Sequence, residues 1–192
     1  EQQTNTTGPN ANIIYSRIDS TTISHNGNFK SPIITAAEVA FLKAEAYQKG
    51  WASGNAKQAF VDGMLFSTQF FYDLNEISDD SRNKVTAPTD GAVTGYAEKV
   101  WENASDKVGA IITQKWLNFG YIQSAQAWTE VRRTGYPQLY YPEDNLSGVF
   151  KNVPNRLPYP NTERSSNTTK WQEQLQTMGG SDDPYYKLFW AK

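Results

Sequence analysis

The sequence predicts an all-α fold made of αα-hairpins, with long irregular loops and an extended carboxy-terminal tail. Apolar residues recur at spacings of three and four between residues 36 and 134, as in amphipathic helices. Glycines stand where these patterns stop, and prolines gather after residue 135. The chain has 192 residues, of which 38% are hydrophobic, so it is long enough to enclose a core.

Residues 1–30 differ in composition from the rest of the chain. They are rich in Asn, Thr, Ser and Gly, and their large apolar residues are few. Such a segment predicts loops with at most one short strand, and it cannot bury much surface by itself. We therefore assign residues 1–30 to a loop-rich leader, which is expected to pack on another part of the protein. Residues 31–192 form the carboxy-terminal helical region.

The first helix is predicted over residues 36–47. Thr35 and Glu38 have the spacing of a capping box, in which a hydroxyl and a carboxylate bind the free amides of a helix start. The helix is apolar nearly all round, and Gly50 ends it. We expect water to reach only one strip of it, formed by Glu38, Glu45 and Lys49.

A second helix is predicted over residues 56–74, with Asn55 as its N-cap. The turn Trp-Ala-Ser-Gly is short enough to join the two helices as an αα-hairpin. The step from Ala56 to Phe60 has the A-x3-F spacing of a tetratricopeptide repeat, and small residues stand where the helices would touch. The sequence therefore predicts a tetratricopeptide-like pair.

Residues 75–95 are polar and read as a loop of about 20 residues, a length that is often functional or mobile. A helical pattern returns over residues 96–103. Ser105 is then expected to cap a stronger helix that stops at Gly120, and a further helix is predicted over residues 122–134. These last two helices would form a second αα-hairpin.

Beyond residue 135 the regular patterns end. Prolines make this stretch an extended chain that runs over the surface. We expect one polar helix within residues 163–178. Residues 179–192 are expected to form a turn and an aromatic end that docks on the body of the protein.

Composition excludes several classes of function. The net charge is −2, and the longest basic run is the pair Arg132–Arg133, so a broad nucleic-acid surface is not expected. The chain has no cysteine, which excludes disulfides, thiolate catalysis and Cys-ligated zinc within it. No apolar run reaches the roughly 20 residues that a membrane-spanning helix needs.

The residues do not predict catalysis. His25 is the only histidine, and a single loop histidine is usually a solvated side chain. The pairs Asp79–Asp80 and Asp182–Asp183 are interpreted as turn-forming, solvated carboxylates, because neighbours in sequence rarely face each other across a cleft. Calcium contacts from Asp79, Asp80 and Asp90 would lack a diagnostic spacing. We therefore predict no enzyme activity and no cofactor.

Aromatic rings and polar side chains in loops are the remaining candidates for a ligand site. Tyr and Trp faces can stack on sugar rings, although most loop aromatics anchor their loop to the core. Six aromatics lie in or beside predicted loops: Trp51, Tyr72, Tyr96, Trp101, Tyr140 and Tyr141. By loop position and side-chain type, the predicted ligand-binding residues are Tyr15, His25 and Phe29 in the leader and Asp79, Asp80 and Tyr96 in the long loop.

The run AWTEVRRTGYP at residues 127–137 has a structural interpretation. Trp128 and Val131 are expected to pack inward, and the Arg132–Arg133 pair stands where cations favour a helix end. Gly135 permits a left-handed stop, and Pro137 prevents continuation of the helix. One of the two arginines could also hold carbonyls or a carboxylate of the tail.

Five segments in fixed order resemble the SusD/RagB-like nutrient-binding family. The most specific is residues 127–137. The others are SPIITAAEVAFLKAEA (31–46), IITQKWLNFG (111–120), RLPYPNTE (156–163) and GGSDDPYYKLFWAK (179–192). The resemblance covers residues 31–192. It implies that the chain contains the last two of four tetratricopeptide-like pairs. It also implies that the amino-terminal half of the same protein lies outside this sequence.

The resemblance implies a function that the residues alone do not show. Members of this family are lipid-anchored on the outer face of the outer membrane in Bacteroidota and act as the lid of a TonB-dependent transporter of the SusC type. The expected ligand is an oligosaccharide, bound without turnover. The alternatives are a peptide ligand on the same kind of lid and a tetratricopeptide-type adaptor for a protein partner.

Overall fold

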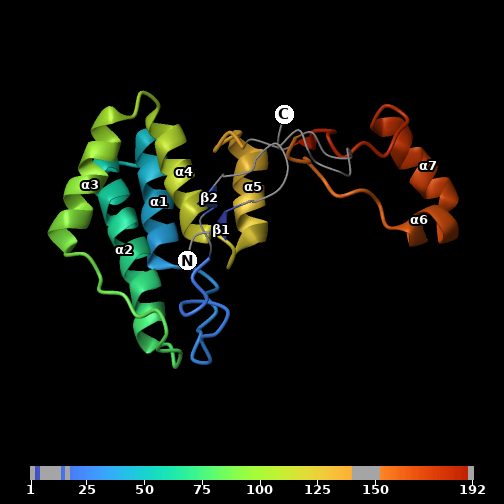
Figure 1. Ribbon diagram of the computed structural model, residues 1–192. Helices are drawn as coiled ribbons and strands as arrows, with labels where there is room; N and C mark the ends of the chain where they lie inside the picture. Colours follow the sequence, from blue (N-terminus) through green and yellow to red (C-terminus); the bar gives the residue numbers. More distant parts are fainter. Residues whose placement is uncertain (1–2, 5–13, 16–17, 140–151, 190–192) are drawn as a thin grey trace. The chain divides into compact units, whose positions relative to one another are not determined.

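The computed structural model describes residues 3–4, 14–15, 18–139 and 152–189. The chain divides into two compact units, residues 1–111 and 112–192. Within the described residues there are seven helices and one pair of two-residue strands, β1 (Gln3–Thr4) and β2 (Ile14–Tyr15), which are antiparallel (Figure 1). The predicted all-α fold with helical hairpins is confirmed.

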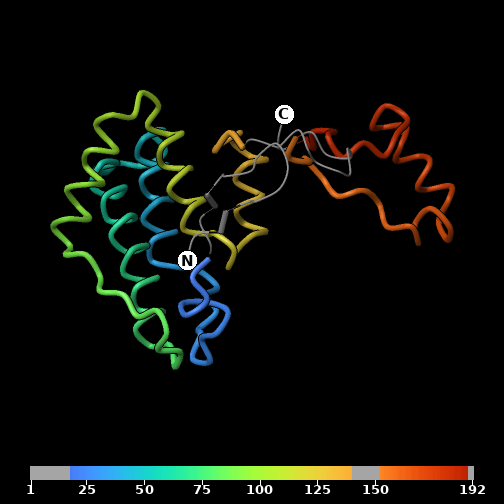
Figure 2. Tube along the Cα trace, viewed as in Figure 1, coloured from blue at the N-terminus to red at the C-terminus, as the bar shows by residue number. Residues whose placement is uncertain are grey.

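Three helices lie side by side in the first unit (Figures 1 and 2). They are α1 (Ala36–Gln48), α2 (Ala56–Ile77) and α3 (Asp90–Asn103). Aromatic rings from all three meet in the core. The ring centroids of Phe41 and Phe60 are 6.1 Å apart, and those of Phe60 and Trp101 are 5.3 Å apart. Trp101 therefore belongs to the packed interior and not to a loop. Ile111 of α4 (Lys107–Phe119) joins the same core.

The two N-caps and the glycine stop of the first hairpin are as predicted. The Thr35 hydroxyl accepts a hydrogen bond from the Glu38 amide at 3.1 Å, and the Asn55 side chain accepts one from the Gln58 amide at 3.0 Å. Gly50 has a φ of +71°, which suits a residue without a side chain at a helix stop. Gly63 allows the close approach of the two helices, because a Cβ there would lie 2.6 Å from the Phe41 ring.

Glu45 was predicted to lie on the solvent-exposed strip of α1. This prediction is wrong, because Glu45 is only 2% exposed. Lys49 lies one turn further on, and its ammonium is 2.7 Å from the Glu45 carboxylate. Because a cation satisfies this carboxylate locally, the residue can be buried. The open face of α1 instead carries Val39 and Leu42, which are 37% and 42% exposed.

The long loop is shorter than predicted. Helix α2 continues to Ile77, and α3 begins at Asp90, where the Thr89 hydroxyl accepts a hydrogen bond from the Ala92 amide. The predicted N-cap of α4, Ser105, is also wrong. The cap is Asp106, whose carboxylate accepts a hydrogen bond from the Gly109 amide at 3.0 Å. Capping side chains, rather than apolar spacing, set both boundaries.

In the second unit, the end of α4 and α5 (Ser124–Thr134) are joined by a buried ion pair. The Lys115 ammonium lies 2.8 Å from the Glu130 carboxylate, and Arg133 binds the other oxygen of that carboxylate at 2.7 Å. Lys115 is only 2% exposed. A buried cation needs such a partner, so the pair fixes which faces of the two helices meet.

The Trp128 indole holds the tail. Its N–H donates to the carbonyl of Pro154 at 2.7 Å, and the Arg132 guanidinium stacks on its ring at 4.1 Å. Trp128 and Val131 are half-buried, and Gly135 has the left-handed φ of +77° that was expected. Trp128 therefore contributes a described contact between α5 and the tail, and the contact predicted for an arginine stays a prediction.

The tail forms two short helices where one was predicted. They are α6 (Asn161–Ser166) and α7 (Thr168–Thr177), with a break at Asn167. The buried Arg156 pairs with Asp182, whose second oxygen accepts from the Tyr159 amide at 2.9 Å. Asp182 is therefore not a solvated turn residue, although Asp183 does accept from the Tyr185 amide as a turn residue would. Phe189 is 87% exposed, and the residues after it, like Tyr140 and Tyr141, lie outside the described part.

Replacing Gly63 by alanine is expected to destabilise the protein by about 1–3 kcal/mol, because the new methyl would overlap the Phe41 ring. Gly95→Ala is the matched control. That glycine is also helical, but nothing lies within 4 Å of its Cβ position, so alanine there should stabilise by about 0.5–1 kcal/mol. Urea unfolding measures both. Equal effects at the two sites would contradict the close approach of α1 and α2.

Arg156→Gln is expected to lower the free energy of unfolding by about 2–4 kcal/mol, because it leaves the Asp182 carboxylate partly buried without its cation. Lys170→Gln removes an exposed partner of Glu173 and should cost about 0.5 kcal/mol or less. Thermal unfolding followed by circular dichroism compares the two. Similar melting temperatures for the two variants would show that the Arg156–Asp182 pair does not stabilise the tail.

Candidate ligand pocket

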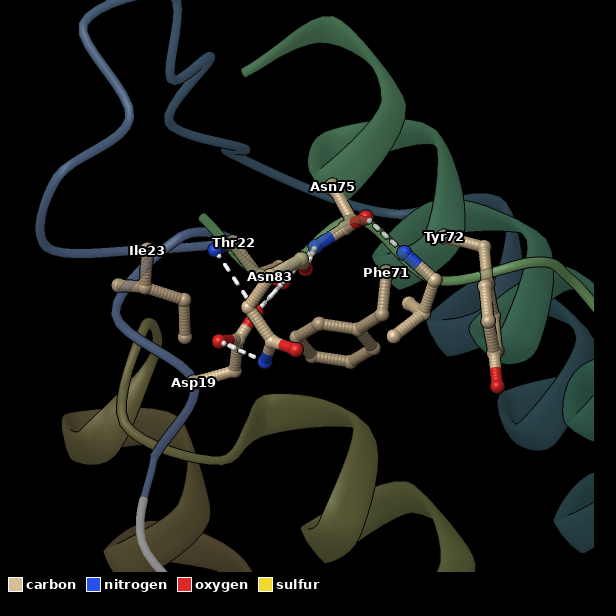
Figure 3. A pocket seen from close by; sticks show the side chains of 8 residues that line it. Asp19, Thr22, Ile23, Phe71, Tyr72, Asn75 and Asn83 are labelled. Carbon is tan, nitrogen blue, oxygen red and sulfur yellow. Dashed lines mark hydrogen bonds between the residues drawn. The ribbon is translucent and has the colours of Figure 1, made fainter. Parts of the chain in front are cut away.

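A pocket of about 280 Å³ opens in the first unit, where the leader meets the end of α2 and the loop after it (Figure 3). Its walls combine aromatic and aliphatic side chains with carboxylate and amide groups. The lining residues are Asp19, Thr22, Ile23, Phe71, Tyr72, Asn75, Asn83 and Val85. Residues 19–23 are distant in the sequence from the other lining residues, so only the fold brings them together.

Asn75 connects the three segments. It is 1% exposed, and its amide nitrogen donates to Asp19 at 3.2 Å, to the Thr22 hydroxyl at 3.0 Å and to the carbonyl of Asn83 at 3.0 Å. Its amide oxygen accepts from the backbone N–H of Val85 at 3.0 Å. One buried side chain therefore binds the leader and the loop to α2 at once.

Asp19 is the charged member of this network. Burial by itself would raise the pKa of its carboxyl group, but hydrogen bonds from the Thr22 hydroxyl, the Asn83 amide and the backbone of Thr22 and Thr21 lower the pKa below its ordinary value. The Asn83 bond is 2.8 Å, and the backbone bond from Thr22 is 3.0 Å. Asp19 is thus an anion at neutral pH, stabilised by donors on every side that faces the protein.

The carbonyls at the end of α2 have partners from outside the helix. Asn26 donates to the carbonyl of Leu74 at 2.8 Å, and Asn28 donates to that of Ile77 at 2.9 Å. The Lys84 ammonium lies at 2.5, 2.9 and 2.6 Å from three further carbonyls, those of Asn75, Glu76 and Ser78. Since a cation also favours a helix C-terminus, Lys84 holds the loop tightly against α2.

Three of the predicted ligand-binding residues lie together beside this pocket. Asp79 accepts from the Gly27 amide at 2.7 Å. Asp80 lies 3.6 Å from the His25 ring nitrogen and 2.7 Å from the Arg82 guanidinium, which also contacts His25. These groups fasten the leader to the loop. Their binding of a ligand stays a prediction.

The other three predicted residues are placed differently. Phe29 is half-buried, and its amide donates to the carbonyl of Asn26 at 3.2 Å. Tyr96 lies on α3, is 62% exposed and does not line the pocket. For Tyr15 only the backbone pairing with Gln3 is described. The structure therefore groups His25, Asp79 and Asp80 and leaves Tyr96 apart from them.

Most residues that line the pocket were not predicted from the sequence. Tyr72 was one of the six candidate aromatics, but Asp19, Asn75 and Asn83 carry no motif. The one available signal was Asn75 itself, an amide that follows Leu74 on the inward face of a helix. A polar residue in that position needs buried partners, but a sequence does not say which segments supply them.

The chemistry of the pocket is that of binding. Phe71 and Tyr72 offer ring surfaces, and Asn83 offers an amide at an exposed edge. In the part of the chain that the structure describes, no three His, Asp or Glu side chains are grouped so that they could hold a metal ion. None of the described helices is long and apolar enough to cross a membrane.

A protein-family model described as "Susd and RagB outer membrane lipoprotein" matches residues 3–191 of the chain. The search of curated proteins found no match to the chain. The match extends over most of the leader as well as over residues 31–191, where the recognisable motifs lie.

Solved structures of SusD-like proteins are similar to the chain. A Bacteroidetes SusD-like protein is 27% identical with a TM-score of 0.68, over 84% of this chain and 30% of that one. A chitin-binding protein is 28% identical (TM-score 0.63; 82% and 33%), and a SusD homologue from Bacteroides fragilis is 26% identical (TM-score 0.67; 84% and 35%). The chain spans about a third of the length of these proteins.

Asp19→Asn is expected to reduce the free energy of unfolding near neutral pH by about 1–2 kcal/mol, because it weakens hydrogen bonds to a charged group. Since the pKa of Asp19 is lowered by folding, its contribution is fully present above the unfolded pKa of about 3.9 and is lost as the pH falls through the lower folded pKa. The variant should therefore lose less stability than the parent below about pH 4.

Urea unfolding between about pH 7 and pH 3 measures this difference. Asp73→Asn, on the exposed side of α2, is the control and should follow the parent protein. Parallel pH curves for Asp19→Asn and the parent would refute the role given to Asp19.

Proposed function

The chain belongs to the SusD-like family of outer-membrane lipoproteins, and from this membership we propose that it is part of a non-catalytic surface protein that binds a nutrient glycan. The observation that carries the proposal is the family match over residues 3–191. A relative described as a chitin-binding protein, 28% identical, supports a carbohydrate as the ligand.

The pocket at the end of α2 is the proposed contact point for the glycan within this chain. Support comes from the side chains around it. The rings of Phe71 and Tyr72 can pack on the C–H faces of a sugar, a contact of about 0.5–1.5 kcal/mol by analogy with aromatic pairs. The segments that form the pocket are already held in place by Asn75 and Lys84, so little order has to be created on binding.

The complete protein is proposed to be lipid-anchored at the outer membrane and to act as the lid of a TonB-dependent transporter of the SusC type. Because the chain spans only about a third of the structures it matches, transport is a proposal about the whole protein. The first unit contributes a face of the glycan site in this proposal, and the partner surface remains to be mapped by cross-linking to the transporter.

Isothermal titration of the complete protein against a panel of neutral oligosaccharides and peptides tests the ligand class. We expect saturable binding to an oligosaccharide and an unchanged glycan after prolonged incubation. Tyr72→Ala should weaken that binding about three- to tenfold, which corresponds to the roughly 1 kcal/mol of one ring contact. Tyr121→Ala removes an aromatic that is 75% exposed and lies outside the pocket, and it should have no effect.

Three results would count against parts of this proposal. Binding of peptides without binding of any oligosaccharide would replace the glycan by the peptide alternative. Release of shorter sugars would refute the non-catalytic function. A loss of affinity in Tyr96→Ala with none in Tyr72→Ala would move the site from the pocket to the outer face of α3.

A further inference from the structure

Asp19 and Asn75, two of the polar residues that line the pocket, are already occupied by hydrogen bonds within the protein. Both oxygens of Asp19 accept hydrogen bonds, from Asn83 and Thr21 on one side and from Thr22 and Asn75 on the other. The Asn75 amide has partners for both its nitrogen and its oxygen. A ligand hydroxyl placed against these groups would find few partners, and burial of an unpaired hydroxyl is unfavourable.

The free surface of the pocket is mostly apolar. It consists of the aliphatic side chains of Ile23 and Val85 and the rings of Phe71 and Tyr72. The volume of about 280 Å³ is at the lower end of ligand pockets, which run from about 300 to 1,000 Å³. The space therefore suits part of a ligand, such as one ring substituent, and not a long ligand.

One hydrogen-bond acceptor stands at the edge of this apolar surface. The Asn83 amide nitrogen is used by Asp19 at 2.8 Å, whereas no hydrogen bond to its amide oxygen is found among the described residues. Asn83 and Phe71 both line the pocket (Figure 3). An incoming group that has both a methyl and an N–H donor would satisfy the acceptor and the apolar wall together.

We propose that this pocket binds the acetamido group of an N-acetylated sugar, with the methyl against Ile23, Phe71 and Val85 and the N–H donating to Asn83. The inference rests on the proposed glycan-binding function and adds the class of sugar. A hydroxyl at the same sugar position has no methyl for the wall, so the pocket selects N-acetylhexosamines over plain hexoses.

A pair of oligosaccharides with the same linkage tests the selection. Triacetylchitotriose and cellotriose share a β-1,4 backbone and differ only in the acetamido or hydroxyl group on each ring. Titrations of the complete protein should give at least about tenfold tighter binding of triacetylchitotriose, the size of step that one well-placed group produces. Equal affinities for the two trimers would overturn the inference and leave the proposed glycan binding in place. Failure of every oligosaccharide to bind would overturn both.

Two substitutions tie the selection to the pocket. Val85→Trp fills it from a side chain that is 50% exposed, so the fold should tolerate it, and the preference for the acetylated trimer should disappear. Val39→Trp is the matched control, because Val39 lines a separate hollow on α1 and α2. Asn83→Ala should weaken the binding of triacetylchitotriose about fivefold through loss of one hydrogen bond. An undiminished preference in Val85→Trp together with an undiminished affinity in Asn83→Ala would overturn the assignment of this pocket.

Discussion

The carbonyl oxygens at the end of α2 have no partners within their helix, and the arrangement around the pocket follows from how the chain satisfies them. Asn26 and Asn28 reach them from the leader, and Lys84 reaches them from the following loop. Both segments are thereby brought to one helix end. Asn75 then binds the two segments to each other, and the pocket is the space that their side chains leave between them.

Polar interactions of the same kind organise the second unit. The buried Lys115–Glu130 pair sets the contact between α4 and α5, the Trp128 N–H binds the carbonyl of Pro154, and Arg156 binds Asp182. These side chains lie in the segments that resemble the SusD/RagB-like family. Trp128 and Arg156 hold irregular chain in place, which a protein with long loops requires because loops bury little apolar surface.

The proposed binding function is consistent with the way the polar groups of the pocket are used. Its carboxylate and amides are consumed by the protein, and the lowered pKa of Asp19 keeps that group an anion without a proton to donate. The polar groups that hold the pocket wall in place are therefore not available to a ligand. What is left for a ligand is shape, ring surface and one amide oxygen, which favours recognition of a small apolar substituent on a polar molecule.

The sequence by itself determined the family and the all-α class. It also determined those helix ends that depend on local chemistry, such as the ones at Thr35, Asn55 and Gly135. Those signals act within a few residues, so they can be read along the chain. Tertiary structure alone decided that Glu45 is buried, that Asp182 pairs with Arg156, and that Asp19, Asn75 and Asn83 form one network. Asp182 and Arg156 are 26 residues apart, and Asp19 is 56 residues from Asn75 and 64 from Asn83. Hydrogen bonds over such separations form only after helices have packed, and no local pattern of the sequence specifies them.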